Sequence, residues 1–116
     1  MPALGTILST ADVPASTIPT VTPGATPALT APSGRSIIIW AWTAGEAETL
    51  NLTGTPALGA TAYMIITNDA IARLITFGTG FTAQAGTLLG TSNKKSIIVW
   101  ISDGTTFIEV SRLSGL

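Results

Sequence analysis

The sequence predicts an all-β fold: an antiparallel β-sandwich, jelly-roll-like, of about seven to eight strands, preceded by an extended N-terminal arm. Three observations predict it. No segment carries apolar residues at helical spacing; the apolar residues form short runs rich in β-branched and aromatic side chains; and Gly, Asn, Asp and Pro separate these runs at regular intervals. Short strands at even spacing are typical of sandwiches and barrels. A length of 116 residues suits one domain with a single core.

Residues 1–34 are predicted to be the extended arm, and residues 35–116 the sandwich domain. The arm carries six prolines in a background of Thr, Ala and Ser, with no aromatic residue and Asp12 as its one acidic or basic side chain. This composition favours extended backbone and builds no core of its own. Ordering it costs about 1 to 2 kcal/mol per residue, and a partner surface is the expected source of the opposing contacts. A flexible linker that a lattice contact or the chain's own domain orders is the alternative. The predicted partner-binding residues are the apolar ones: Leu4, Ile7, Leu8, Val13, Ile18, Val21 and Leu29.

The strands of the domain follow in order. Residues 36–43, 48–52 and 95–102 read as strands, and Asp103-Gly104 predicts a hairpin into a last strand at residues 106–112. A central β-hairpin is expected from two apolar runs, residues 61–67 and 71–77, joined across Asn68-Asp69. Residues 78–90 are predicted to be irregular, with at most one short strand among them.

Two of these strands are apolar on both faces. A strand of a free-standing antiparallel sandwich usually keeps one face in water, but residues 36–43 and 95–102 do not show that alternation. Either loops or a second subunit covers their outer faces. Because a large exposed apolar patch is unusual on a monomer and charge is sparse, a second subunit is the favoured explanation. The subunit-interface candidates are Trp40, Trp42, Ile98 and Trp100.

Composition points the same way and argues against several classes of protein. Charged residues make up 9% of the chain, against about 25% in a typical domain. A net charge of -1 tolerates close association of copies and argues against nucleic-acid binding, which needs clustered Lys and Arg. The longest apolar run, residues 37–42, is far shorter than the ~20 residues of a membrane span, and residues 1–16 lack the features of a signal peptide.

Almost no residue suits chemistry, and no catalytic, cofactor or metal site is predicted. The chain has no Cys and no His, the side chains that nucleophilic and acid-base catalysis most often use. Glu46, Glu48 and Asn51 could in principle bind Ca²⁺, but a solvated strand edge is expected there. Trp40, Trp42, Trp100, Tyr63 and Phe107 could stack on a sugar, although packing in a core or interface is the favoured interpretation.

Several segments resemble a β-sandwich module of tailed-bacteriophage virion proteins, which occurs in head and tail fibres and in capsid decoration (cement) proteins. The most specific segments are RLITFGTGF at residues 73–81 and DGTTFIEV at residues 103–110. Further similarity lies in LNL at 50–52, GATAYMII at 59–66 and KSIIVW at 95–100. The similarity spans about residues 49–112. The family often has Trp after the DGT turn, where this chain has Phe107.

The resemblance implies a non-enzymatic structural role and trimers about a threefold axis. A short arm ahead of the module suits a cement protein, so we expect a homotrimer on the outer surface of a virion that binds across subunits of the major capsid protein. A head or tail fibre component that binds a host glycan is the first alternative. A soluble carbohydrate-binding module, acting as a monomer, is the second.

Overall fold

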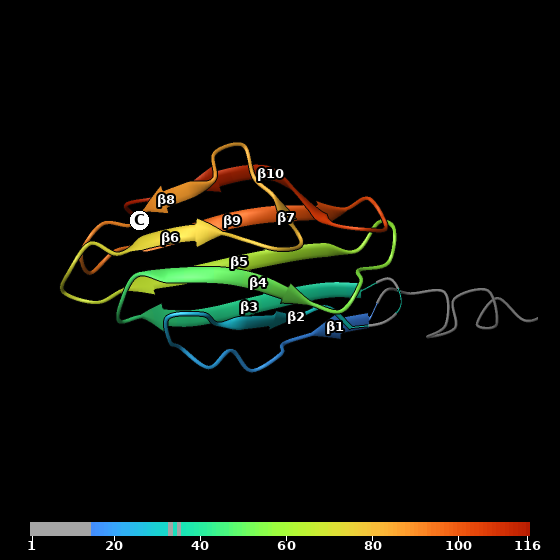
Figure 1. Cartoon of the computed structure of the whole chain (residues 1–116), viewed down its shortest axis with the longest axis horizontal. Helices are drawn as coiled ribbons and strands as arrows, with labels where there is room; N and C mark the ends of the chain where they lie inside the picture. Colours follow the sequence, from blue (N-terminus) through green and yellow to red (C-terminus); the bar gives the residue numbers. More distant parts are fainter. Residues whose placement is uncertain (1–14, 33, 35) are drawn as a thin grey trace, which may run out of the picture.

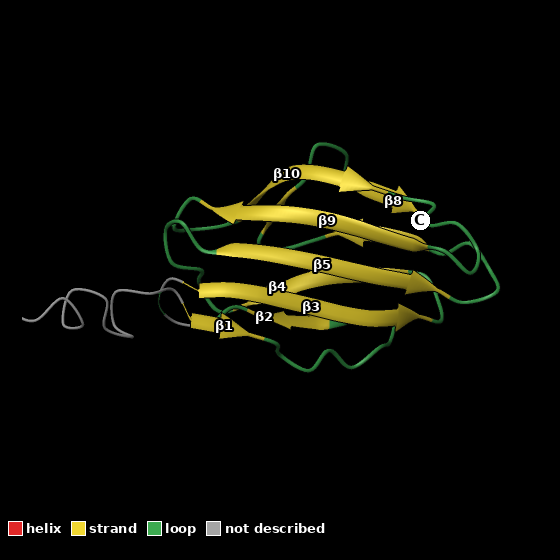
Figure 2. Ribbon diagram, turned by 180° about the vertical axis from the view of Figure 1, so that it is seen from behind, coloured by secondary structure: helices red, strands yellow, loops and turns green. Residues whose placement is uncertain are grey.

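The computed structural model describes residues 15–32, 34 and 36–116, and this part of the chain is all-β (Figures 1 and 2). Its strands form two sheets that face each other across one core. The strands are β1 (Ala15–Thr17), β2 (Ala28–Thr30), β3 (Ser36–Ala44), β4 (Glu48–Thr53), β5 (Thr61–Asn68), β6 (Leu74–Phe77), β7 (Phe81–Thr82), β8 (Thr87–Leu89), β9 (Lys95–Ser102) and β10 (Phe107–Leu113). The predicted strands at residues 36–43, 48–52, 95–102 and 106–112 are confirmed within one or two residues.

The chain passes back and forth between the two sheets. The larger sheet has the order β1-β3-β5-β9-β10-β7, and the smaller one β2-β4-β6-β8. Strands β1 to β6 alternate between them, so β3 pairs in parallel with β1 and β5, while β4 pairs in parallel with β2 and β6. The first six strands therefore form a coil of the kind found in two-sheet β-solenoids.

The prediction of an antiparallel sandwich is therefore wrong for the first half of the chain. Antiparallel pairing is confined to β5 with β9, β9 with β10, and β6 with β8 among the described strands. The physical reason is that each coil turn brings the chain back to its starting sheet in the same direction. Alternating burial looks the same in parallel and antiparallel strands, so the sequence pattern did not distinguish them.

The predicted central hairpin is also wrong. Strands β5 and β6 lie in different sheets, and residues 69–73 connect them across the core. Asn68 is buried and donates a hydrogen bond from Nδ2 to the carbonyl oxygen of Thr91, which fixes the end of β5 to the loop before β9. Ile66 and Ile75, on either side of the connection, are both buried in the shared core.

The hairpin predicted at Asp103-Gly104 is confirmed. It joins β9 to β10, with Ser102 opposite Phe107. The Asp103 Oδ1 atom accepts hydrogen bonds from the backbone N–H groups of Thr105 and Thr106, both at 2.9 Å. Gly104 has a φ of 94°, a left-handed conformation that Gly adopts without a Cβ penalty.

Residues 15–32 belong to the domain rather than to a separate arm. β1 pairs with β3 along the edge of the larger sheet, and β2 pairs with β4 in the smaller one. Leu29 is fully buried and Val21 is nearly so. The predicted boundary between residues 34 and 35 therefore does not separate two units in the described part, and the chain's own domain supplies the contacts that order residues 15–32.

The core between the sheets is built from inward-facing aromatic and aliphatic side chains. Trp40 packs edge-on against Phe107 with 5.6 Å between ring centroids, and Phe77 packs edge-on against Trp100 at 5.3 Å. Phe81 contacts both tryptophans. Such edge-to-face pairs stabilise a fold by about 0.5 to 1.5 kcal/mol beyond the apolar area that they bury. The core thereby holds the strands of both sheets in place.

Candidate interaction surface

The outer face of the larger sheet carries a continuous set of apolar side chains. Strands β3, β5 and β9 alternate between residues buried in the core and residues that point outward. The outward residues of these strands and of β10 are mainly aliphatic, with Tyr63; the polar ones are Thr43, Thr61, Thr67, Lys95 and Ser111. We call the apolar members of this set the apolar face. Its members are Ile37, Ile39, Ala41, Tyr63, Ile65, Ile97, Val99, Ile101, Ile108, Val110 and Leu113.

Strand register arranges the apolar face in rows across four strands, β3, β5, β9 and β10. The middle row runs from Ile39 through Tyr63 and Val99 to Ser111. The rows beside it contain, in the same strand order, Ile37, Thr61, Ile101 and Ile108, and Ala41, Ile65, Ile97 and Leu113. Directly opposed side chains lie about 4.5 to 5.5 Å apart, so the rows shield one another and leave Tyr63 41% exposed at the centre.

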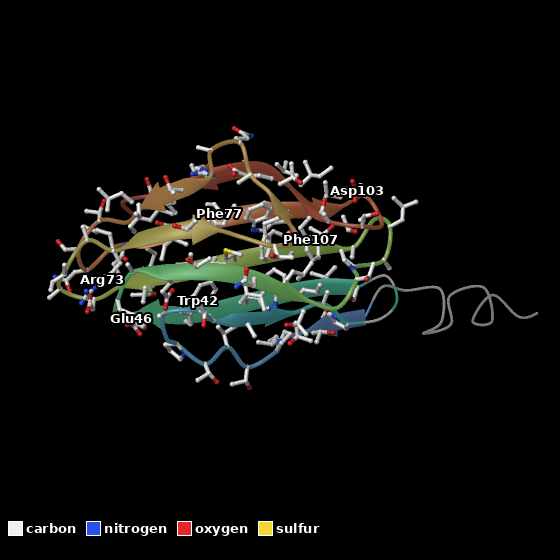
Figure 3. All side chains as sticks on the ribbon, viewed as in Figure 1. Trp42, Glu46, Arg73, Phe77, Asp103 and Phe107 are labelled. Atoms are coloured by element: carbon white, nitrogen blue, oxygen red, sulfur yellow. The ribbon has the colours of Figure 1, made fainter. Side chains whose placement is uncertain are left out.

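Among residues 15–32, 34 and 36–116, charged side chains lie away from the rows of the apolar face. Glu46 and Arg73 are at one end of the strands and Asp103 is at the other (Figure 3). Lys95, at the start of β9, is exposed beside Thr67 at the border of the apolar face. The apolar face therefore offers a partner aliphatic surface and one phenol, with charge only at its border.

The outer face of the smaller sheet has a different composition. Thr49, Thr76 and Thr87 form one row across β4, β6 and β8, and Thr30 and Thr53 pair across β2 and β4. Leu74 and Leu89 are its large aliphatic side chains, paired at one end. Threonine suits a half-buried strand in contact with water, so the two outer faces of the molecule differ in kind.

The four predicted interface residues do not lie on the apolar face. Trp40, Trp42, Ile98 and Trp100 all point into the core, with exposed fractions of 0%, 7%, 0% and 0%. The two-faced strands were recognised correctly, but the wrong face of each was assigned to a partner. Their opposite faces, with Ile37 and Ile39 on β3 and Val99 and Ile101 on β9, are the accessible ones. The tryptophans are the largest side chains of these strands, and this size was the sequence signal that could have identified the inward face.

The predicted arm contacts divide into three groups. Leu4, Ile7, Leu8 and Val13 lie outside the described residues. Val21 and Leu29 belong to the core and are unavailable to a partner. Ile18, directly after β1, is 73% exposed and is the one residue of this prediction that the structure shows open to a partner.

The possible calcium ligands do not converge. Glu46 is exposed in the loop before β4, Glu48 points into the core, and Asn51 points to the opposite side of β4. The Asn51 Oδ1 atom accepts a hydrogen bond from the Thr79 N–H at 3.1 Å. No group of three acidic, His or Cys side chains able to hold a metal ion occurs in the part of the chain that the structure describes.

Glu48 is a carboxyl group buried between the two sheets. It is 2% exposed, and its Oε1 accepts a hydrogen bond from the Trp42 Nε1–H at 2.7 Å, which ties β4 to β3 across the core. Desolvation by burial raises the pKa of Glu48, and this effect outweighs the lowering effect of the Trp42 hydrogen bond. The Glu48 Oε2 atom is also buried, and it has no hydrogen-bond partner among the described residues.

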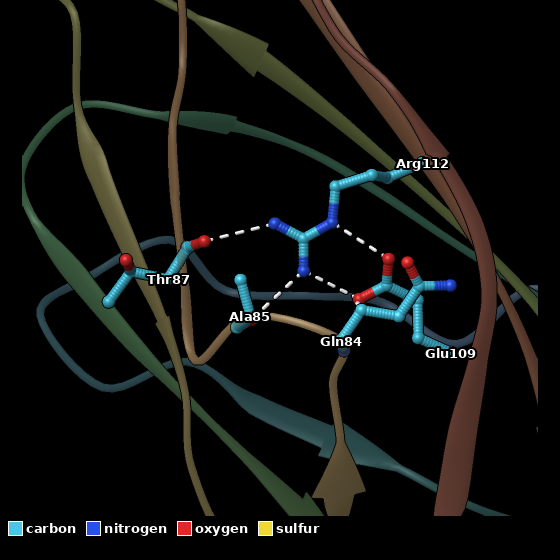
Figure 4. A network of polar contacts seen from close by, with 5 residues as sticks. All are labelled: Gln84, Ala85, Thr87, Glu109 and Arg112. Carbon is cyan, nitrogen blue, oxygen red and sulfur yellow. Dashed lines mark hydrogen bonds and ion pairs between the residues drawn. The ribbon is translucent and has the colours of Figure 1, made fainter.

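The other buried carboxylate, Glu109, is fully engaged by Arg112 (Figure 4). Arg112 Nε donates to Glu109 Oε2 at 2.7 Å, and its Nη atoms donate to the carbonyl oxygens of Thr87 and Ala85. The hydrogen bond from Arg112 lowers the pKa of Glu109. This network joins β10 to the start of β8 and to the segment between β7 and β8, and Glu109 Oε1 also accepts a hydrogen bond from the Gln84 N–H at 3.1 Å.

The possible sugar-stacking platform does not form. Trp40, Trp42, Trp100 and Phe107 are buried in the core, and Tyr63 is the member with an exposed ring. One ring among aliphatic side chains offers a sugar few hydrogen-bond partners. The surface is better suited to a flat apolar partner.

No family model matches this chain, and no curated protein matches it. A helix long and apolar enough to cross a membrane is not found among residues 15–32, 34 and 36–116.

Proposed function

We propose that this chain is a non-enzymatic structural protein of a bacteriophage virion, a capsid decoration or cement protein. In this proposal, copies of the chain form a homotrimer on the outer surface of the head. The trimer binds across neighbouring subunits of the major capsid protein and reinforces the shell. The proposed relationship to jelly-roll-like virion modules belongs to the same proposal and rests on the resemblance of particular segments.

The observation that carries the proposal is the apolar face. Monomeric proteins rarely expose a contiguous apolar patch larger than a few hundred Å², and here apolar side chains occupy the outside of four paired strands. Exposed apolar patches of this kind mark sites where proteins bind one another, as a protein that assembles into a shell requires.

The two most specific segments of the resemblance support the proposal by their positions. Residues 73–81 run from the loop before β6 into β7, and residues 103–110 form the hairpin that leads into β10. β7 and β10 pair in parallel with Phe81 opposite Phe107, so the two segments lie side by side in one part of the fold.

Reinforcement of a shell requires many attachments rather than one strong site. A trimer that holds three copies together makes each later attachment intramolecular, so weak contacts combine into strong binding. Leu4, Ile7, Leu8 and Val13 remain the proposed capsid contacts, because they are the apolar side chains ahead of the domain.

The test uses virions that lack this protein, with the protein added back. We expect such particles to release their DNA at a lower temperature, and the wild-type chain to restore the original release temperature. An I7D/L8D double variant should fold and restore it only at a much higher concentration. Equal release temperatures with and without the wild-type protein would contradict the proposal.

A further inference from the structure

We propose that the apolar face is the surface through which copies of this chain bind one another. The inference deepens the proposed function, on which its virion context rests, because it assigns one surface to the self-association. Its occupant is a second copy of this chain, which presents the same side chains.

The charge distribution favours a copy over an unrelated partner. Close to a symmetry axis each side chain meets its own equivalents, so a charge at the centre of an interface between copies would face the same charge. The rows of the apolar face contain aliphatic, tyrosine, threonine and serine side chains, and charge begins at Lys95 on the border. A net charge of -1 per chain adds little repulsion between copies.

The size of the apolar face is sufficient for specific association. Four strands of about eight residues, spaced ~4.8 Å apart with a ~3.3 Å rise per residue, give the outer face of β3, β5, β9 and β10, its polar border included, a projected area of roughly 500 Å² per copy. Two copies together would bury about 1,000 Å², which is the lower limit for a specific interface. The core holds the strands of this sheet in place, so little ordering is needed on association.

Tyr63 occupies the position where a contact between copies contributes most. It stands at the middle of the central row, between Ile39 and Val99. Binding energy concentrates at the centre of an interface, in residues that neighbours seal from water, and tyrosine is enriched there. A carboxylate at this position would be repeated in every copy and would repel its equivalents.

The experiment compares Tyr63→Glu with Leu74→Glu in the full-length chain, by sedimentation equilibrium between about 1 and 200 μM. The two sites are matched: both are outward-facing strand residues, 41% and 44% exposed, but Leu74 lies on the smaller sheet. We expect wild type and Leu74→Glu to associate alike, and Tyr63→Glu to raise the dissociation constant at least 100-fold.

Folding is checked in each variant by the fluorescence of the three buried tryptophans. If Tyr63→Glu does not fold, Ile101→Lys, on the adjoining row, supplies the same comparison at a second site. A wild-type chain that is monomeric at 200 μM would overturn the inference, as would folded Tyr63→Glu or Ile101→Lys that associates like wild type. Equal dissociation by Leu74→Glu would also overturn it. Normal association without any effect on virion stability would instead contradict the proposed function alone.

Discussion

At the scale of single residues, Glu48 connects burial to pH dependence. Its carboxyl group lies in the core with one hydrogen bond from Trp42, and burial raises its pKa above the ordinary value. A group whose pKa is higher in the folded than in the unfolded chain binds its proton more tightly when folded. Its contribution to stability is therefore greatest below the ordinary glutamate pKa of about 4.3 and is lost as the pH rises through the raised value.

Glu48→Gln should remove that loss. The amide oxygen can still accept the Trp42 hydrogen bond and carries no charge to desolvate, so the variant should be more stable than wild type at pH 7. The difference should shrink as the pH falls toward 4. Urea unfolding followed by tryptophan fluorescence measures it, with Glu46→Gln in the exposed loop as the control for net charge. A Glu48→Gln variant less stable than wild type at pH 7 would contradict this account.

The Arg112 network gives the opposite dependence on pH. Because Arg112 lowers the pKa of Glu109, this pair stabilises the fold above the ordinary glutamate pKa and ceases to do so as the pH falls through the lowered value. Arg112→Ala would leave the Glu109 carboxylate, whose side chain is 0% exposed, without its partner.

Loss of one partner of a buried pair typically costs about 3 to 5 kcal/mol, and we expect a value near the lower end, about 3 kcal/mol, because Arg112 is 22% exposed. Chemical denaturation at pH 7 measures it. Arg73→Ala breaks the Asp69–Arg73 pair, which lies in a loop with both side chains partly exposed, and should cost much less. Equal losses for the two variants would contradict a structural role for the Arg112 network.

At the scale of elements, β2 decides where the domain begins. Leu29 is fully buried between the sheets, whereas Ile18, eleven residues earlier, is exposed. Leu29→Ala should cost about 2 to 5 kcal/mol, the usual range for a buried leucine, and Ile18→Ala should change stability by about 0.5 kcal/mol or less. Thermal unfolding of the isolated chain measures both. A Leu29→Ala variant as stable as wild type would restore the prediction of a separate arm through residue 34.

The sequence predicted the strong strands and missed how they connect. Residues 36–43 and 95–102 are apolar runs flanked by turn residues, and the local pattern was enough to find β3 and β9. Whether β5 and β6 pair as a hairpin or cross between sheets depends on contacts such as those of Asn68 with Thr91 and Gly90, more than twenty residues away. The Pro-rich composition of residues 15–32 likewise concealed two strands that depend on β3 and β4 for their pairing.

The sequence predicted that two strands are apolar on both faces, but the residues named as accessible were those of the inward face. Strands apolar on both faces indicated that a partner covers one of them. The choice of face depends on volume: Trp40 and Trp100 fill the space between the sheets together with Phe107 and Phe81, and only the smaller side chains of the same strands are left outside. Single-strand patterns do not contain that volume constraint.

At the scale of the whole molecule, sparse charge and a divided surface belong together. The charged side chains of the described residues lie at strand ends and in the Arg112–Glu109 network beside β10. The outer face of the smaller sheet is rich in threonine, and the outer face of the larger sheet is mainly aliphatic. Association through the aliphatic face would leave the threonine-rich face in water or against a second partner.

The most direct test of this account is the mass of the purified chain in solution as a function of salt. Association through an uncharged apolar face should give a particle of an integral multiple of 11.8 kDa, and raising NaCl from 0.05 to about 1 M should leave that mass unchanged, because salt screens charge pairs and leaves apolar contacts intact. Light scattering coupled to gel filtration measures it. A monomer of 11.8 kDa at every salt concentration, or an assembly that dissociates as salt rises, would contradict the account.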